Sequence, residues 1–107
     1  MNEKRILCLG DSYTIGESVL PEERFPNQTI SLLKKKNILF DTPEIIATTG
    51  WTTDELNSGI DKNPPSGFYD VVTLLIGVNN QYRGRDKEEY RSQFSDLLKR
   101  AFFFLNQ

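Results

Sequence analysis

An alternation of short apolar runs with helical patterns constrains this 107-residue chain more than any other feature. The runs lie at 4–9, 43–49 and 70–76. They are short and nearly continuously apolar, which is typical of strands that are covered on both faces. The third, DVVTLLI at Asp70–Ile76, is rich in β-branched residues and is predicted to lie in the centre of a covered parallel sheet.

A helical pattern follows each run. The first opens at Pro26 and closes at Asn37, the second is capped by Thr52 or Thr53, and the third runs from about Lys87 to Asn106. Segment 81–86 reads as a polar loop. Strands that alternate with helices predict an α/β fold in which right-handed crossovers join parallel strands and helices cover both faces of the sheet.

Two apolar surfaces of the predicted fold lack a cover. The third strand has a bare edge unless a fourth strand follows it. The last helix ends in three adjacent phenylalanines, Phe102–Phe104, of which at least one must face away from the apolar stripe. We therefore expect further chain beyond this sequence, or an oligomer or partner that covers the sheet edge and the phenylalanine end.

Charge and residue counts exclude several kinds of site. Lys plus Arg is 13 against 15 Asp plus Glu, so a nucleic-acid partner is not expected. The absence of histidine excludes histidine metal sites and a complete Ser-His-Asp triad within the chain. The single cysteine, Cys8, excludes an intrachain disulfide and is predicted to be inert core. The apolar run Ile6–Leu9 is too short for a signal peptide or membrane span, so we expect a cytoplasmic location.

Polar clusters that contain glycine follow all three predicted strands. They are GDS at 10–12, TGW at 49–51 and GVNN at 77–80. Because the carboxyl ends of parallel strands meet at one edge of the sheet, these clusters are expected to converge there. Ser12, on a turn at a helix entrance, exposes a hydroxyl; Gly50 permits close approach of backbone to a ligand; and Asn79 supplies an amide donor. A serine surrounded by such donors has the parts of an oxyanion hole.

The motifs GDSYT at Gly10–Thr14, the isolated Gly50 and GVNN at Gly77–Asn80 together resemble those of the SGNH, or GDSL-type, serine hydrolases. The resemblance implies a flavodoxin-like three-layer α/β/α sandwich, esterase or lipase activity on a small-molecule ester, and no cofactor or metal. It places Ser12 as the nucleophile and implies that Gly50, through its backbone N–H, and Asn79, through its side chain, bind the oxyanion.

The resemblance covers nearly all of the chain but only about half of a family domain. Residues 1–107 are therefore expected to be the N-terminal part of a single SGNH-hydrolase-like domain whose C-terminal strands are missing. Asn80 stands where the family usually has Asp, a mild departure. The family's D-x-x-H motif is absent, so the catalytic Asp and His are missing and this chain is predicted to hydrolyse esters poorly.

Other interpretations of the same residues remain open. Ser12 taken alone is better explained as a helix cap or a residue that tightens a turn, and only its register with Gly50 and Asn79 favours the nucleophile. The three turns also suit a non-catalytic module that binds a small anion. A third interpretation is an interaction fragment that needs a partner. Asp11 is interpreted as a turn residue that holds its loop, and Asn80 as a left-handed turn residue.

The remaining polar and aromatic residues near the motifs receive structural interpretations. Trp51 and Tyr13 either line a substrate cleft or close over the core. Tyr82, Arg83 and Arg85 are predicted to lie in a solvated loop. Asp54 and Glu55 are interpreted as partners of a helix dipole rather than an acid/base pair.

Overall fold

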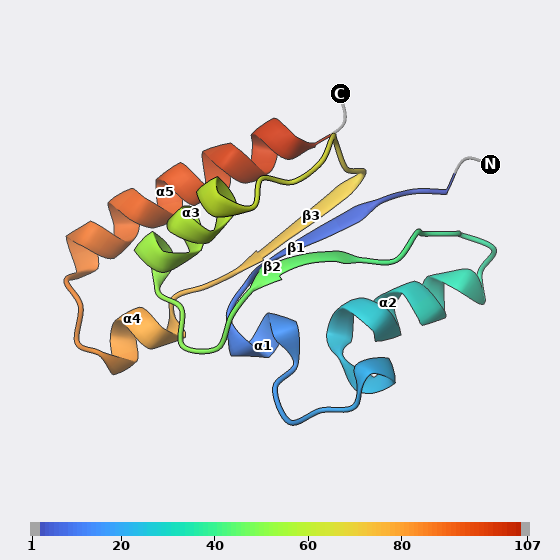
Figure 1. Cartoon of the computed structure of the whole chain (residues 1–107), viewed down its shortest axis with the longest axis horizontal. Coiled ribbons are helices and arrows are strands. Elements are labelled where there is room, and N and C mark those ends of the chain that lie inside the picture. The colour runs from blue at the N-terminus through green and yellow to red at the C-terminus, as the bar shows by residue number, and fades with distance from the viewer. Residues whose placement is uncertain (1–2, 106–107) are drawn as a thin grey trace.

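The computed structural model describes residues 3–105, which form a parallel sheet with the strand order β2-β1-β3 (Figure 1). Strand β1 is Ile6–Gly10, β2 is Glu44–Ala47 and β3 is Val71–Leu75. The last residue of β1 is in register with the last residue of each neighbour. All three strands therefore end at the same level, and the predicted α/β fold is confirmed.

The central strand of this sheet is β1, whose five residues are all buried. The prediction that 70–76 lies in the centre of the sheet is wrong for the described residues, because β3 pairs with β1 alone. Its ends are open to solvent, with Val71 39% and Leu75 50% exposed. A continuous apolar run reports that both faces of a strand are covered, and it carries no information about a partner at its edge.

Helices cover both faces of the sheet, as expected for a three-layer sandwich (Figure 1). On one face lie α3 (Thr53–Lys62) and α5 (Lys87–Phe104), which contact each other. On the other lie α1 (Ser12–Ile15) and α2 (Phe25–Lys34), the latter preceded by the 3₁₀ turn η1 (Pro21–Glu23).

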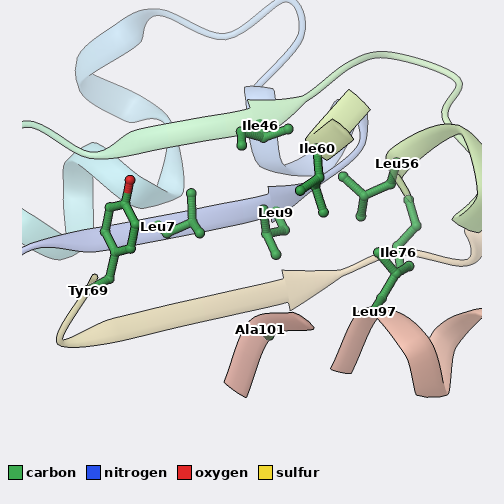
Figure 2. Close-up of a cluster of buried hydrophobic side chains, with 9 residues drawn as sticks. All are labelled: Leu7, Leu9, Ile46, Leu56, Ile60, Tyr69, Ile76, Leu97 and Ala101. Atoms are coloured by element: carbon green, nitrogen blue, oxygen red, sulfur yellow. The ribbon is translucent and has the colours of Figure 1, made fainter. Parts of the chain in front are cut away.

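The main core fills the space between the sheet and the α3/α5 layer (Figure 2). Its buried members are Leu7, Leu9, Ile46, Leu56, Ile60, Tyr69, Ile76, Leu97 and Ala101. Because side chains alternate along a strand, Cys8 faces the opposite side of the sheet from its two neighbours. It is fully buried, and burial raises the pKa of its thiol, so it is a neutral core residue as predicted.

Local signals set the helix boundaries. Thr52 begins α3 with a capping box, and Asp86 begins α5 by accepting a hydrogen bond from the Glu89 N–H at 2.9 Å. Asn37 adopts a left-handed φ of 63° just beyond α2. The short helix α4 (Val78–Tyr82) was not predicted from the sequence.

The C-terminal end of α5 is apolar and largely open. Phe102 and Phe103 are exposed, the latter by 70%, whereas Phe104 packs against the core. The predicted helix end at Asn106 lies outside the described residues. Within 3–105, no helix combines the length and apolar character needed to cross a membrane.

Candidate active site

The three polar clusters of the sequence lie at one edge of the sheet, where the parallel strands end (Figure 1). Ser12 is the first residue of α1 and follows β1. Gly50 lies in the turn after β2, and Asn79 lies in α4 after β3. Central β1 therefore presents Ser12 between the other two clusters.

The first turn is held tightly against the sheet. Asp11 is buried and caps α1, since its Oδ1 accepts a hydrogen bond from the Tyr13 N–H at 3.0 Å. This confirms its interpretation as a turn residue. A Cβ on Gly10 would lie 2.1 Å from Thr14 Oγ1 and 2.7 Å from the Leu75 carbonyl oxygen, so only glycine allows this close approach. Ser12 is held, half-buried, at the start of α1.

The second turn holds Gly50 with a φ of 86°, in the region that glycine adopts without strain. Among residues 3–105, no group accepts a hydrogen bond from its N–H, which leaves this donor available to a ligand. The Trp51 ring packs on Gly59, where a Cβ would come within 2.2 Å of it, and joins the core. Trp51 therefore closes over the core, one of its two predicted roles.

The third turn is bonded directly to the second. Asn79 Nδ2 donates to the Trp51 carbonyl oxygen at 3.0 Å. A carboxamide has two N–H donors, so one remains for another acceptor after this bond orients the side chain. These contacts bring Asn79 and the Gly50 turn together, whereas Ser12 reaches the same edge through the strand register.

Asn80 is buried within α4, and the prediction that it is a left-handed turn residue is wrong. Its Oδ1 accepts from the Thr53 N–H at 3.1 Å, and its Nδ2 donates to Thr53 Oγ1 at 2.9 Å. A carboxamide offers a donor and an acceptor together, and Asn80 uses both to join α4 to the first turn of α3.

Arg83 and Arg85 lie between α4 and α5, Arg83 exposed and Arg85 half-exposed, in agreement with their prediction as solvated loop residues. Their guanidinium groups also bind the segment that follows β2, which was not predicted. Arg83 Nη2 donates to the Gly50 carbonyl oxygen at 2.6 Å and lies 3.2 Å from Glu55 Oε1. Arg85 Nη2 lies 3.3 Å from Asp54 Oδ1. The acidic pair and the two arginines are visible in the sequence, but their pairing depends on how α3 and α4 are placed by the sheet.

The acidic pair at the start of α3 is structural. A hydrogen bond from the Thr52 backbone N–H is the main cause that lowers the pKa of Glu55, and one from the Thr52 hydroxyl is the main cause that lowers the pKa of Asp54. Both carboxylates are therefore charged at neutral pH. This agrees with their interpretation as helix-start partners rather than an acid/base pair.

A cavity of about 820 Å³ opens beside the carboxyl end of β3. Its walls include Tyr13, Leu75, Ile76, Val78 and Tyr90, and it is mostly apolar. The three candidate residues do not line the cavity, although immediate neighbours of Ser12 and Asn79 do. The cavity is therefore adjacent to the candidate site. Tyr13 lines it and is 65% exposed, so it does not close over the core, and a role in a substrate cleft stays a prediction.

The chemistry of this arrangement is incomplete. It brings a serine hydroxyl, a free backbone N–H and an amide donor to one edge of the sheet, which are groups that a nucleophile and an oxyanion hole require, but the whole sequence contains no histidine that could act as a base. Tyr82, which follows the third motif within α4, is 90% exposed and contributes no group to the three turns among the contacts of residues 3–105.

Comparisons with known proteins agree with this description. The chain is similar in structure to AlinE4, an SGNH-hydrolase family esterase, at 25% identity and a TM-score of 0.71, over 94% of this chain and 54% of that one. It also resembles TesA (14% identity, TM-score 0.70) and the psychrotrophic esterase EstA from Pseudoalteromonas sp. (18%, 0.66), each over 92% of this chain and 54% of the other. The latter two likenesses show the fold alone. No curated protein matches the chain.

The chain thus spans about half the length of these solved structures. A family model gives the most direct assignment, because it matches residues 8–102, a range that includes all three motifs. Structure and sequence comparison agree on a hydrolase fold. The chain belongs to the GDSL-like lipase/acylhydrolase family.

Proposed function

We propose that this chain carries the nucleophile and oxyanion half of a serine ester hydrolase. Ser12 is the nucleophile, and the oxyanion donors are the Ser12 and Gly50 N–H groups and the Asn79 side chain. The observation that supports this most is the strand register, which brings three separate motifs to one edge of the sheet. The Asn79 bond to Trp51 adds a second contact between two of them.

In this mechanism Ser12 Oγ attacks the carbonyl carbon of an ester as its proton passes to a histidine base. The carbonyl oxygen becomes an oxyanion that accepts hydrogen bonds from the Gly50 N–H and the free Asn79 N–H. Collapse of the tetrahedral intermediate expels the alcohol, which takes the proton from histidine, and leaves an acyl-enzyme on Ser12. Water then attacks the acyl-enzyme and releases the acid.

The histidine and its aspartate partner have to come from outside this sequence, which contains no histidine. They would approach from the outer side of β3, where the apolar cavity opens and where no strand within residues 3–105 pairs with Val71–Leu75. Without a base, Ser12 is an ordinary alcohol, and its reactivity toward esters falls by several powers of ten, roughly 10⁴-fold or more. An anion-binding module is not favoured, because the family and the AlinE4 likeness indicate a hydrolase.

The test compares hydrolysis of a chromogenic acetate ester by this chain and by a C-terminally extended version that supplies the histidine. We expect turnover near background for the chain and turnover at least about 10³-fold faster for the extended version, which Ser12→Ala removes. Equal turnover by both forms would contradict the role of histidine. Turnover that survives Ser12→Ala would contradict the nucleophile assignment.

A further inference from the structure

Arg83 occupies an unusual place for a residue in a polar loop. It follows α4 directly, and its guanidinium contacts the turn after β2. There Nη2 donates to the Gly50 carbonyl oxygen at 2.6 Å and pairs with Glu55 Oε1 at 3.2 Å. One side chain therefore joins the segment after β3, the Gly50 turn and the first turn of α3.

Gly50 depends on its neighbours for its orientation. It has no side chain, its φ is 86°, and within residues 3–105 its own N–H donates to no group. Its carbonyl oxygen is held by Arg83, and the following residue is held at both ends, with the Trp51 N–H donating to the Thr48 carbonyl oxygen at 3.2 Å and its carbonyl oxygen accepting from Asn79. The Gly50 carbonyl lies in the peptide plane between Gly50 and Trp51, and the Gly50 N–H lies in the preceding plane, joined to it through the Gly50 Cα. Holding the carbonyl therefore limits rotation about the Gly50 Cα, which is the rotation that would turn its N–H away.

Arg83 is in turn oriented by an independent anchor. Glu55 Oε1 accepts from the Thr52 N–H at 3.0 Å in the α3 capping box, so this carboxylate is already fixed when Arg83 pairs with it. A guanidinium presents several donors in a rigid plane, which suits simultaneous contact with a carboxylate and a carbonyl oxygen. A shorter or more flexible cation would hold both partners less well.

We propose that Arg83 is a positioning residue that holds the Gly50 N–H toward the reacting oxygen of the substrate. The inference rests on the proposed oxyanion role of Gly50. Arg83 acts through the Gly50 carbonyl and needs no contact with substrate. Preorganised donors are effective because they need no reorganisation during the reaction. If Gly50 were less ordered, kcat would therefore fall even in a well-folded protein.

Arg85 provides a matched control. It lies two residues further along, and its guanidinium also pairs with an acidic residue in the first turn of α3, Asp54, at 3.3 Å. Among the contacts of residues 3–105 it makes none with Gly50. Arg83→Met and Arg85→Met therefore each remove one positive charge and one ion pair with the first turn of α3. Arg85→Met also removes a pair with Glu89, and only Arg83→Met releases the Gly50 carbonyl.

The experiment measures the backbone order of Gly50 in this chain without ligand. The dipeptide Thr-Gly occurs once, at Thr49-Gly50, so ¹³C′-threonine with ¹⁵N-glycine labelling identifies its amide signal. We expect an order parameter near 0.85 in the wild type and in Arg85→Met, and below about 0.6 in Arg83→Met, with Arg83→Lys between them. An ordered Gly50 in Arg83→Met, or equal loosening in both methionine variants, would overturn the inference.

A separate measurement tests the proposed function on the same sample. Methylphosphonate, a tetrahedral oxyanion, is titrated into the wild-type chain, and we expect the Gly50 amide signal to shift. If the signal does not move, the oxyanion role of Gly50 fails, whereas the ligand-free order parameters still decide what Arg83 does. Melting temperatures of all variants establish that each is folded.

Discussion

The two sides of the candidate site are built differently. On the β2 side, the segment 50–55 is held by hydrogen bonds and ion pairs from Asn79, Asn80, Arg83 and Arg85. On the outer side of β3, an apolar cavity opens, and among residues 3–105 no second strand pairs with Val71–Leu75; the chain after α5 makes an isolated bridge with Tyr69, just before β3. The side that would hold an oxyanion, residues 50–55 with their side-chain contacts, is therefore fixed, and we call it the locked side. The side from which a base would arrive, the outer edge of β3, has no such contacts among the described residues, and we call it the open side.

Under the proposed function, the two sides serve different parts of the reaction. Oxyanion stabilisation depends on donors that are fixed before the reaction, and contacts among the described residues hold the turns that carry the proposed donors Gly50 and Asn79. Proton transfer needs a histidine, which nothing in this sequence supplies. The locked side should therefore respond strongly to single substitutions, and the open side weakly.

The largest effect is expected from Asn79→Ala on the locked side, measured in a C-terminally extended, active version. Loss of one oxyanion donor should lower kcat by about 10²- to 10³-fold with little change in KM. Steady-state kinetics with an acetate ester checks this, and Gln81→Ala, an exposed position in the same helix, serves as the control. An unchanged kcat would show that Asn79 does not donate a hydrogen bond to the oxyanion.

Asn80→Ala should lower stability rather than chemistry. It leaves the Thr53 N–H without its buried acceptor, at a cost of about 2 kcal/mol in the free energy of unfolding. Urea unfolding of this chain measures the change, again beside Gln81→Ala. A loss below about 0.5 kcal/mol would mean that this contact does not hold the locked side together.

Glu55, at the start of α3, is expected to make a smaller contribution to the free energy of unfolding, and this contribution depends on pH. The pKa of Glu55 is lowered on folding, chiefly by the Thr52 N–H, so its stabilisation is present above the ordinary glutamate pKa and is lost as pH falls through the lowered folded value. Because Glu55 is partly exposed, we expect less than about 1 kcal/mol. Between pH 6 and pH 3, the free energy of unfolding should fall less steeply with pH for Glu55→Gln than for the wild type. Equal slopes for the two proteins would contradict this.

The smallest effect is expected on the open side. Leu75 is 50% exposed at the end of β3, so Leu75→Ser should change the stability of this chain by less than about 0.5 kcal/mol. In an extended version that covers the edge, the same substitution should cost considerably more. Equal costs in both forms, measured by urea unfolding, would indicate that the β3 edge stays uncovered.

The sequence predicted the parts of this fold that depend on local pattern. Short apolar runs gave the strands, and Thr52 and Pro26 marked helix starts, because capping and periodicity are properties of neighbouring residues. The edge position of β3 was missed because an apolar run does not report strand order. Helix α4 was missed because its five residues carry no apolar period.

For the candidate site, the motifs identified Ser12, Gly50 and Asn79, and the fold placed them at one edge. The network around them was not predictable from spacing. Asn80 and Arg83 act on residues about thirty positions earlier, and only the parallel register brings those segments together. Their residue types alone are equally typical of a solvated turn.

The central claim is that Ser12 is a nucleophile completed by a histidine from outside this sequence. The most direct measurement is peptide mapping by mass spectrometry after treatment with a fluorophosphonate, which phosphonylates activated serines with loss of fluoride. The account predicts one adduct on Ser12 in the C-terminally extended version and none in this chain or in the extended Ser12→Ala variant. An adduct on another residue, or equal labelling of Ser12 in both lengths, would contradict it.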